Sequence, residues 1–577
     1  MITLTPLVHV LKHASLSFAV ATACSLRLLA AEIPAAQVHD LSLLVSPELP
    51  CVWPSGMMQH IVTPTRTFGP GAYHREVIII DEHTGTQWDA PAHFVPPPDS
   101  GLPGAGPMGK ITGEKVPVWQ FVGEACVIDV TAHRDDAKPG HSFLITPDHV
   151  QAWEKKHRPL GAGDVVLFRS DYTDRYYQPI ATGGVRFVHT VLRKQTPGWP
   201  APTPECMQYL GSKGVMSAGL DSPSMGPVPD LAVATHQAGG ALGMIWIECG
   251  TNFKSLPPTG AFYALLPAKH TGGSGGESRV LAITEPALAQ RLIESARARR
   301  VTDLSVVLDE NFPATWPGYE PADDAQRYIS KTLNAFGAAR GPFFALTHTM
   351  DSQAGTHLVT PAFSLPPKKF DLAKLAPEIR KLRAEFEKRF GPLGHSDLTI
   401  DKVPLGPLLG DARVIDVKHL VGTITLGPRP ASPQITVEHI KGYEERTGPI
   451  ARGEIVLFRS GYSDAHYQPL PDAPDLDPFM AAPLAGKAEG WLALSPEAVI
   501  YLAKQGVRCI GTDGPTLGGV DANAALLTNW AAAKHQMLAV ECLTNLGGLP
   551  EKGAFFLFAP IKIQGARSGY GRALALH

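Results

Sequence analysis

The sequence predicts an α/β protein made of two related domains in tandem, and three observations lead to this fold class. The chain has 577 residues, whereas a single hydrophobic core stops growing at roughly 250–300 residues. The two halves repeat the same sequence patterns in the same order. Within each half, short apolar runs typical of buried strands alternate with segments that carry helix-start signals.

The internal repeat defines the expected domain boundaries. Residues 163–174 match residues 453–464, and the tripeptide Asp-Leu-Ser occurs near the start of each copy. The offset between matching segments grows along the chain, which indicates loop insertions in the second copy. We therefore expect domains at 38–283 and 301–577. Residues 284–300 are expected to form a helical linker, whose basic C-terminal end suits the helix dipole.

Local patterns within the first half predict both strands and helices. Short runs rich in β-branched and apolar residues predict buried strands at 77–80, 125–130, 165–168 and 243–247. Thr146 and Thr203 each precede a proline, the arrangement typical of a helix N-cap followed by its first residue. The 56 glycines and 53 prolines predict many turns. The order of the strands does not follow from these patterns.

Composition excludes several classes of function. The formal net charge is −3 with a pI near 6.7, so global charge favours neither nucleic acid nor an anionic membrane as partner. With 44% hydrophobic and 18% charged residues, the chain is typical of a globular protein. Seven cysteines without a Cys-x-x-Cys pair predict scattered buried thiols, with one or two disulfides as the alternative if the protein is exported.

Residues 1–31 are expected to be a signal peptide. Lys12 and His13 precede an apolar run at 14–24, and small residues recur at 30–31. The run is too short for a stable membrane span. We therefore expect a periplasmic or secreted protein without a membrane partner, except for a lipid anchor if residues 21–24 form a lipoprotein cleavage box. The alternatives are an N-terminal extension and a cytoplasmic location.

Two clusters of metal-binding residue types follow predicted strands or end them. His83, Asp89 and His93 lie on one tightly turning segment directly after the strand at 77–80. Glu248 ends the apolar run at 243–247, where a buried carboxylate is costly unless it is paired or bound to metal. His236 precedes it across two glycines, so a helix turning back into this strand would bring them together. A single histidine is more often structural, but this set of five favours a site for Zn²⁺ or Mn²⁺.

Residues 83–94 resemble the signature of the cyclase-like metal hydrolases, His-x-Gly-Thr-His-x-Asp-x-Pro-x-His-Phe. That group includes bacterial kynurenine formamidase and isatin hydrolase. The resemblance covers nearly all of residues 38–283 and, more weakly, 301–577. It implies two tandem swivelling β/β/α (cyclase-like) domains, and it implies hydrolysis of an amide, lactam or lactone.

The resemblance also implies a role for each matching residue. It makes His83 and Asp89 metal ligands, with Asp89 able to bridge two ions. His236 and Glu248 would complete a second metal position. His93 would be the acid–base residue beside the metals.

Gln87 departs from the signature because the family has a histidine at this position. An amide oxygen is still a ligand, but a weaker one than imidazole. We therefore expect one or two ions in the first half: the first ion is held loosely, the site holds a single ion, or the preferred ion shifts toward Mn²⁺.

The second half is expected to be a degenerate copy. At the positions of His83, Asp89, His93 and His236 it carries Gln353, Val359, Phe363 and Asn529. His357 falls at the position of Gln87, and Glu541 alone is kept. Since proteins that resemble this family are often homodimers, we expect an intramolecular pseudo-dimer in which the second half shapes the first half's pocket. Further homo-oligomers remain open.

The expected activity is metal-dependent hydrolysis of a carbon–nitrogen amide bond in a small molecule, with N-formylkynurenine as the first candidate. A lactone or ester hydrolase and a non-catalytic binding protein are the alternatives. Residues 272–276 also fit the Gly-x-Ser-x-Gly pattern of serine hydrolases. No clear strand precedes them and no helix follows, so this segment is expected to be a flexible loop.

Overall fold

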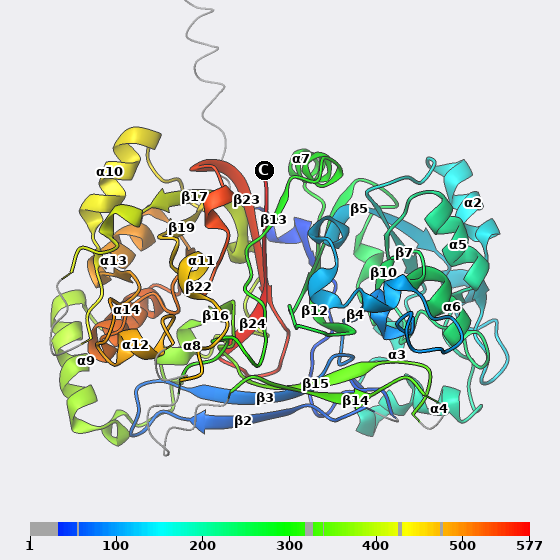
Figure 1. Ribbon diagram of the computed structural model, residues 1–577, viewed down its shortest axis with the longest axis horizontal. Helices are drawn as coiled ribbons and strands as arrows, with labels where there is room; N and C mark the ends of the chain where they lie inside the picture. Colours follow the sequence, from blue (N-terminus) through cyan, green and yellow to red (C-terminus); the bar gives the residue numbers. More distant parts are fainter. Residues whose placement is uncertain (1–32, 55–56, 318–326, 338–339, 425–429, 474–476) are drawn as a thin grey trace, which may run out of the picture.

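The computed structural model describes residues 33–577, except 55–56, 318–326, 338–339, 425–429 and 474–476. The expected signal peptide at 1–31 and Cys24 therefore lie outside the described residues. Two halves stand side by side, and helix α7 (Pro286–Arg297) connects them (Figure 1). The carboxylate of Glu285 caps this helix by accepting from the backbone nitrogen of Leu288.

The first half is built on a sheet that closes on itself. Strand β4 pairs with β10 on one side and with β12 on the other, which closes a ring of seven strands, and β1 adds to its edge. The strands in ring order are β12 (Gly275–Ile283), β11 (Ala261–Pro267), β5 (Val122–Asp129), β7 (Asp164–Arg169), β9 (Ser217–Leu220), β10 (Ile245–Glu248) and β4 (Gln87–Asp89), with β1 (Val38–Asp40) beside β12.

The second half repeats this topology strand for strand. Its ring contains β24 (Ser568–Leu576), β23 (Lys552–Pro560), β17 (Leu409–Asp416), β19 (Ile455–Arg459), β21 (Cys509–Thr512), β22 (Leu538–Glu541) and β16 (His357–Val359), with β13 (Val301–Asp303) at the edge. The prediction of an α/β fold with two tandem domains is therefore confirmed.

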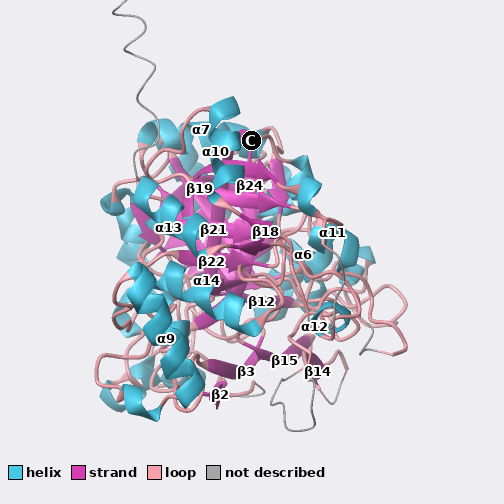
Figure 2. Cartoon of the chain, turned by 90° about the vertical axis from the view of Figure 1, so that its left-hand side faces the viewer, coloured by secondary structure: helices cyan, strands magenta, loops and turns pink. Residues whose placement is uncertain are grey.

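Helices lie on the outer side of each half (Figure 1), and Figure 2 shows those of the second half, such as α9 and α13, in front of the strands. The predicted helix starts are correct: Thr146 forms a capping box with His149, and the Thr203 hydroxyl accepts from the backbone nitrogen of Cys206. The helices of the first half are α2 (Pro147–Lys156), α3 (Tyr172–Tyr176), α4 (His189–Leu192), α5 (Pro204–Ser212) and α6 (Ala232–Gly240). Those of the second are α8 (Pro361–Ser364), α9 (Pro377–Phe390), α10 (Val437–Thr447), α11 (Tyr462–His466), α12 (Ala481–Leu484), α13 (Pro496–Gln505) and α14 (Ala522–Lys534).

A separate four-stranded sheet joins the halves. Its order is β14 (Ile329–Asn334), β15 (Ala345–Asp351), β3 (Arg75–Asp81) and β2 (Ile61–Arg66), and the central pair β15–β3 is antiparallel. Figure 1 shows the β2–β3 hairpin of the first half reaching beneath the second half, and β14–β15 reaching beneath the first. The predicted strand at 77–80 therefore exists as part of β3, but it belongs to this shared sheet. Two-residue pairs β6 (Leu144–Ile145) with β8 (Ala201–Pro202) and β18 (Gln434–Ile435) with β20 (Ala493–Leu494) complete the strands.

Reciprocal ion pairs also hold the halves together. Asp40 accepts hydrogen bonds from Arg279 of its own half and from Lys562 of the other. Burial would raise the pKa of Asp40, but these two cations lower it below its ordinary value. The equivalent group in the second half consists of Asp303, Arg572 and Lys269. This repetition relates the halves by an approximate twofold arrangement.

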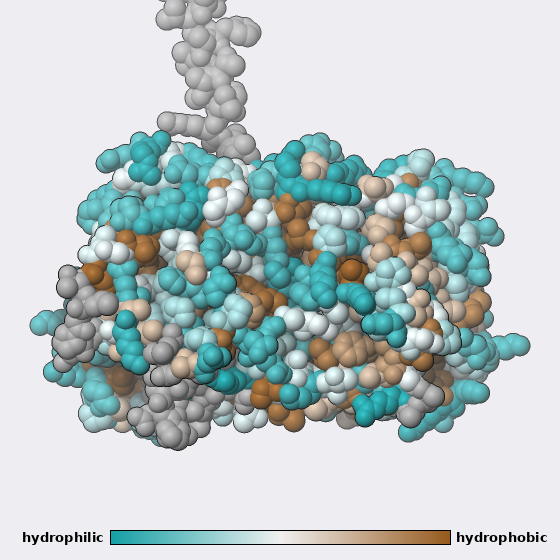
Figure 3. Space-filling model, viewed as in Figure 1, coloured by the Kyte–Doolittle hydropathy of each residue, from teal (hydrophilic) through white to brown (hydrophobic). Residues whose placement is uncertain are grey.

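The described cysteines are all buried free thiols, as expected, and none of these six forms a disulfide. No helix in the described part of the chain is long and apolar enough to cross a membrane. The face shown in Figure 3 is largely hydrophilic, with hydrophobic side chains in small groups.

Candidate metal centre

The structure brings together all six residues that the sequence singled out. Strand β4 carries Gln87 and Asp89, and β10 lies antiparallel to it with Glu248 opposite Gln87. Alternate residues of a strand share one face, so these three side chains point the same way. His93 ends the short 3₁₀ helix that follows β4. Helix α6 carries His236 and turns back into β10, as the two glycines at its end suggested.

Asp89 lies at the centre of the cluster. Its Oδ1 is 3.5 Å from His83 Nδ1, and its Oδ2 is 3.5 Å from His236 Nε2 and 3.9 Å from His93 Nε2. His236 Nε2 is also 3.2 Å from Glu248 Oε1. Two groups of ligand atoms, each within 4.8 Å of one another, share this carboxylate: His83, Asp89 and His93, and Asp89, His236 and Glu248. The arrangement suits a carboxylate between two cation positions.

Two buried atoms in this cluster lack a hydrogen-bond partner among the described residues. They are His83 Nδ1 and Asp89 Oδ1, which face each other at 3.5 Å. A buried polar atom without a partner costs about 1–3 kcal/mol, so native structures rarely leave one unpaired without a reason. A divalent cation between them would satisfy both atoms, and mixed imidazole and carboxylate donors suit Zn²⁺ or Mn²⁺. The residues present therefore fit a metal ion.

The electrostatics of the cluster point the same way. Burial and the neighbouring Glu248 raise the pKa of Asp89. Burial would lower the pKa of His83, but the nearby Asp89 carboxylate outweighs it, with help from Asp81 and Glu82, and raises that pKa to about 9. In His236, Glu248 likewise overcomes burial and raises the pKa. Protons on the histidines therefore balance the buried carboxylates, and a bound cation would displace them.

Gln87 interacts with a carboxylate in this structure. Its Nε2 donates to Glu248 Oε2 over 3.0 Å, so the amide nitrogen, and not the oxygen, meets the neighbouring ligand candidate. In the second half, His357 occupies the equivalent position and its Nε2 lies 3.1 Å from Glu541 Oε2. A histidine in this place can therefore reach the glutamate, while the role of Gln87 as a ligand stays a prediction.

Replacing Gln87 with histidine is expected to tighten metal binding by at least about 10-fold. The change removes the amide that competes for Glu248 and supplies an imidazole, a common metal ligand. Titration of the wild type and Gln87→His with Mn²⁺ and Zn²⁺ by calorimetry measures this directly. Equal affinities would place position 87 outside the coordination sphere.

Several residues of the site carry no signal in the local sequence. Trp246 Nε1 donates to Asp89 Oδ2 over 3.0 Å, and Ser274 Oγ lies 3.2 Å from His83 Nε2. From the second half, the carbonyl of Phe344 lies 2.7 Å from His93 Nδ1. Only Ser274 stood out beforehand, through its glycine-rich segment. That segment leads into β12 and no helix follows, so it is not a nucleophile elbow. The expectation of a flexible loop was wrong, because Ser274 is completely buried.

The matching positions of the second half carry other side chains, Gln353, Val359, Phe363 and Asn529. No group of three potential metal ligands occurs among its described residues. Phe363, at the position of His93, stacks on Tyr73 with ring centroids 5.4 Å apart. The backbone contacts are reciprocal: Phe344 N donates to His93 O, and His74 N donates to Phe363 O. The second half therefore keeps the framework of the site without its donors.

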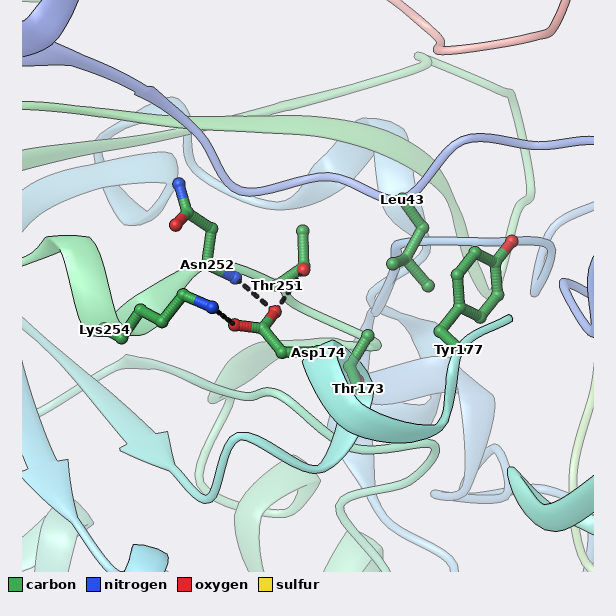
Figure 4. Close-up of a pocket in the computed structure, with 7 residues that line it drawn as sticks. All are labelled: Leu43, Thr173, Asp174, Tyr177, Thr251, Asn252 and Lys254. Atoms are coloured by element: carbon green, nitrogen blue, oxygen red, sulfur yellow. Dashed lines mark hydrogen bonds and ion pairs between the residues drawn. The ribbon is translucent and has the colours of Figure 1, made fainter. Parts of the chain in front are cut away.

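A cavity of about 340 Å³ lies apart from these donors, around Asp174 (Figure 4). Asp174 accepts from Thr251 Oγ1 and the backbone nitrogen of Asn252, and it pairs with Lys254. In the second half, Asp464 makes the same two hydrogen bonds with Thr544 and Asn545. Since the degenerate half keeps this turn, it is a structural feature of the fold and not a catalytic site.

Comparison with known proteins identifies relatives that each match half of this chain or less. An isatin hydrolase of Roseibium aggregatum is 27% identical over 215 residues, 36% of this chain and 74% of that protein. A kynurenine formamidase of Salinibacter ruber is 25% identical over 247 residues, 42% of this chain and 95% of that protein. The solved structure of isatin hydrolase A from Labrenzia aggregata bound to benzyl benzoate is similar at 22% identity and a TM-score of 0.37, covering 50% of this chain and 98% of that one.

The Cyclase family model matches the chain twice, at residues 39–227 and 302–518. These two segments make up more than half of the 577 residues. They also confirm that the tandem domains are cyclase-like. The chain therefore belongs to the Cyclase family, represented in it by two copies.

Proposed function

We propose that this chain is a metal-dependent hydrolase of the carbon–nitrogen bond in an aryl amide or lactam, with its active site in the first half. The observation that carries the proposal is the pair of buried, unpartnered atoms, His83 Nδ1 and Asp89 Oδ1, inside a cluster of further donors. The relatives named isatin hydrolase and kynurenine formamidase support hydrolysis. N-formylkynurenine is the first substrate to test.

Aromatic rings beside the donors favour an aryl substrate. Phe94 lies 4.0 Å from the His236 ring and 4.6 Å from the His93 ring, measured between centroids. Phe343, from the second half, lies 5.5 Å from His93 and 6.0 Å from Phe94. Both phenylalanines are half-buried, whereas the donors are buried. A planar substrate would stack against these rings while its carbonyl meets the donor cluster.

His93 is suited to proton transfer at this site. Its Nδ1 donates to the carbonyl of Phe344, which leaves Nε2 free to accept a proton beside Asp89. Burial and the charges of His83 and His236 hold the pKa of His93 well below 6.5, so it is neutral at pH 7. A bound cation would lower the pKa of water and polarise the scissile carbonyl. His93 then takes a proton from the attacking water and returns it to the leaving nitrogen.

The second half, in this proposal, is a scaffold that completes the pocket and makes the chain an intramolecular pseudo-dimer. It supplies the Phe343 ring and the Phe344 carbonyl that fixes the tautomer of His93. Strand pairing between β15 and β3 holds both in place.

Replacing His93 with glutamine is expected to lower kcat by 10²–10⁴-fold while bound metal is retained, since general acid–base help is typically of that size. Steady-state kinetics together with elemental analysis of the same preparation measure both quantities. His93 also lies within ligand distance of the His83–Asp89 group. Loss of metal together with activity would make it a ligand instead.

The proposed function is tested on the full chain by metal analysis and a substrate panel. Purified protein, chelator-treated protein and protein reconstituted with Mn²⁺ or Zn²⁺ are each assayed with N-formylkynurenine, isatin and aryl lactones. Cleavage of an amide or lactam that requires metal and resists serine-directed inhibitors is the expected result. Cleavage of lactones alone would select the lactonase alternative, and absence of metal after reconstitution would leave a non-catalytic binding protein.

A further inference from the structure

Behind His83, two buried side chains form a hydrogen-bonded chain that leads away from the metal cluster. One imidazole nitrogen of His83, Nδ1, faces Asp89, and the other, Nε2, lies 3.2 Å from Ser274 Oγ. Ser274 Oγ in turn donates to Glu82 Oε2 over 2.7 Å. Ser274 and Glu82 are completely buried. The proposed function does not use these hydrogen bonds between His83, Ser274 and Glu82.

The direction of these hydrogen bonds fixes the tautomer of His83. The Glu82 carboxylate already receives hydrogen bonds from the backbone nitrogens of Ser274 and Leu346, so it acts as an acceptor. The single hydroxyl proton of Ser274 therefore points to Glu82, and its oxygen accepts from His83 Nε2. With its proton on Nε2, the neutral imidazole presents the lone pair of Nδ1 toward Asp89.

The glycines around Ser274 explain how it comes so close. A Cβ atom at Gly273 would lie 2.6 Å from Glu82 Oε1, and one at Gly275 would lie 2.0 Å from the backbone oxygen of Trp88. No real Cβ tolerates such contacts. The glycine-rich segment therefore serves close packing of Ser274 against Glu82 and strand β4, and not nucleophilic catalysis.

Residues of the second half contact Glu82, at the end of this hydrogen-bonded series. Leu346 N donates to Glu82 Oε2 over 2.9 Å, and His348 Nε2 lies 3.4 Å from Glu82 Oε1. Both residues are on β15, and the Tyr328 hydroxyl lies 2.9 Å from His348 Nδ1. Glu82 thus lies between a metal-ligand candidate of one half and a strand of the other.

This arrangement exists on one side of the pseudo-twofold only. At the position of Glu82 the second half has Ser352, and at the position of His348 the first half has Ile78. Arg567 stands at the position of Ser274, and Gln353 stands at the position of His83. The neighbouring Ser568 hydroxyl meets Ser352 at 2.7 Å. A feature needed only for folding would be expected in both copies, whereas this one accompanies the metal donors.

We propose that Ser274 and Glu82 are positioning residues that hold His83 with Nδ1 directed at the metal. We infer further that His348 of the second half acts on the metal centre through Glu82. Both statements rest on the proposed metal site. Partners behind a metal-binding histidine fix its tautomer and orientation, and their loss typically lowers metal affinity 10–100-fold.

The test compares Ser274→Ala with Ser568→Ala in the full chain, using Co²⁺ as the probe. Ser274 directly precedes β12, and Ser568 is the first residue of the equivalent strand β24. Both variants remove a completely buried hydroxyl from neighbouring positions of the repeat, so similar changes in Tm are expected in the metal-free protein. The dissociation constant for Co²⁺, from its visible absorption, should rise 10–100-fold in Ser274→Ala, and the d–d bands should shift. In Ser568→Ala it should change less than about twofold, since no metal donor adjoins that hydroxyl. If Ser274→Ala fails to fold, Glu82→Gln gives the same readout with nearly unchanged shape.

A double-mutant cycle tests the contribution of His348. His348→Ile introduces the residue found at the matching position of β3, and it should weaken Co²⁺ binding about 3–10-fold, at or below the lower end of the range for partners behind a metal ligand. If His348 acts through Glu82 and Ser274, the same change should have no further effect in Ser274→Ala. Additive effects would overturn this link.

The outcomes separate the inference from the proposed function. Wild-type protein that binds no Co²⁺ would contradict the proposed metal site itself, and the inference with it. Wild-type protein that binds Co²⁺ while Ser274→Ala and Ser568→Ala bind it equally well would overturn the inference alone.

Discussion

Asp89→Ala should purify without bound metal and should hydrolyse its substrate more than about 100-fold more slowly than the wild type. Asp89 is the one carboxylate shared by both groups of potential ligands. Residues behind a ligand typically change metal affinity 10–100-fold, so removal of the shared ligand should exceed that range. Elemental analysis and steady-state kinetics on the same preparation measure both effects.

The matched control for this variant is Glu541→Ala. Glu541 is a buried carboxylate of the second half that pairs with His357, at the position equivalent to Glu248. Its loss should leave metal content unchanged. Full metal occupancy in Asp89→Ala, or equal metal loss in both variants, would contradict the assignment of the site to the first half.

Thermal unfolding adds an independent readout for Asp89→Ala. Burial and Glu248 raise the pKa of Asp89, which indicates that the metal-free cluster holds its carboxylates at a cost. Since Asp89→Ala also removes the partner of Trp246 and of two histidines, the Tm of the metal-free variant serves as its own baseline. Added metal should raise Tm only in the wild type, by an amount that corresponds to about 2.7 kcal/mol at 100 times the Kd.

The first half alone, residues 33–298, is not expected to form a soluble, active monomer. Strand β3 would lose its pairing with β15, and Asp40 would lose Lys562. One hydrophobic core contains residues of both halves, among them Leu265, Leu281, Leu557 and Leu574. Separation would expose this apolar surface to water, which favours aggregation.

Co-expression of 33–298 with 299–577 as two chains is the control for that experiment. Size-exclusion chromatography and Co²⁺ binding should show assembly of the two fragments and recovery of the metal site. A stable, monomeric first half with full activity would refute the scaffold role of the second half.

The clustering of the candidate metal donors was predictable because three of them are concentrated in one segment with a specific spacing. Residues 83–94 follow a strand directly, so the chain itself brings His83, Asp89 and His93 close together. His236 and Glu248 were predictable for a related reason: a helix that turns back into a strand leaves few ways to place them. The tandem α/β fold followed from the repeat, since matching patterns at matching intervals require matching topology.

The partners of these donors were not predictable. Ser274 lies 191 positions from His83, and Phe344 lies 251 positions from His93. Contacts over such separations leave no periodicity or spacing in the sequence. The strand at 77–80 shows the same limit: its apolar pattern revealed a buried strand, but not that its neighbour would be β15 of the other half.

The sequence by itself thus determined the fold class, the duplication and the set of candidate metal ligands, because short-range patterns carry each of them. Tertiary structure alone decided that Gln87 faces Glu248, that Ser274 and Glu82 stand behind His83, and that the Phe344 carbonyl of the second half meets His93. These features depend on how the two closed sheets and the two exchanged hairpins pack against each other. Such packing brings together residues from both halves, so no single segment of the sequence encodes it.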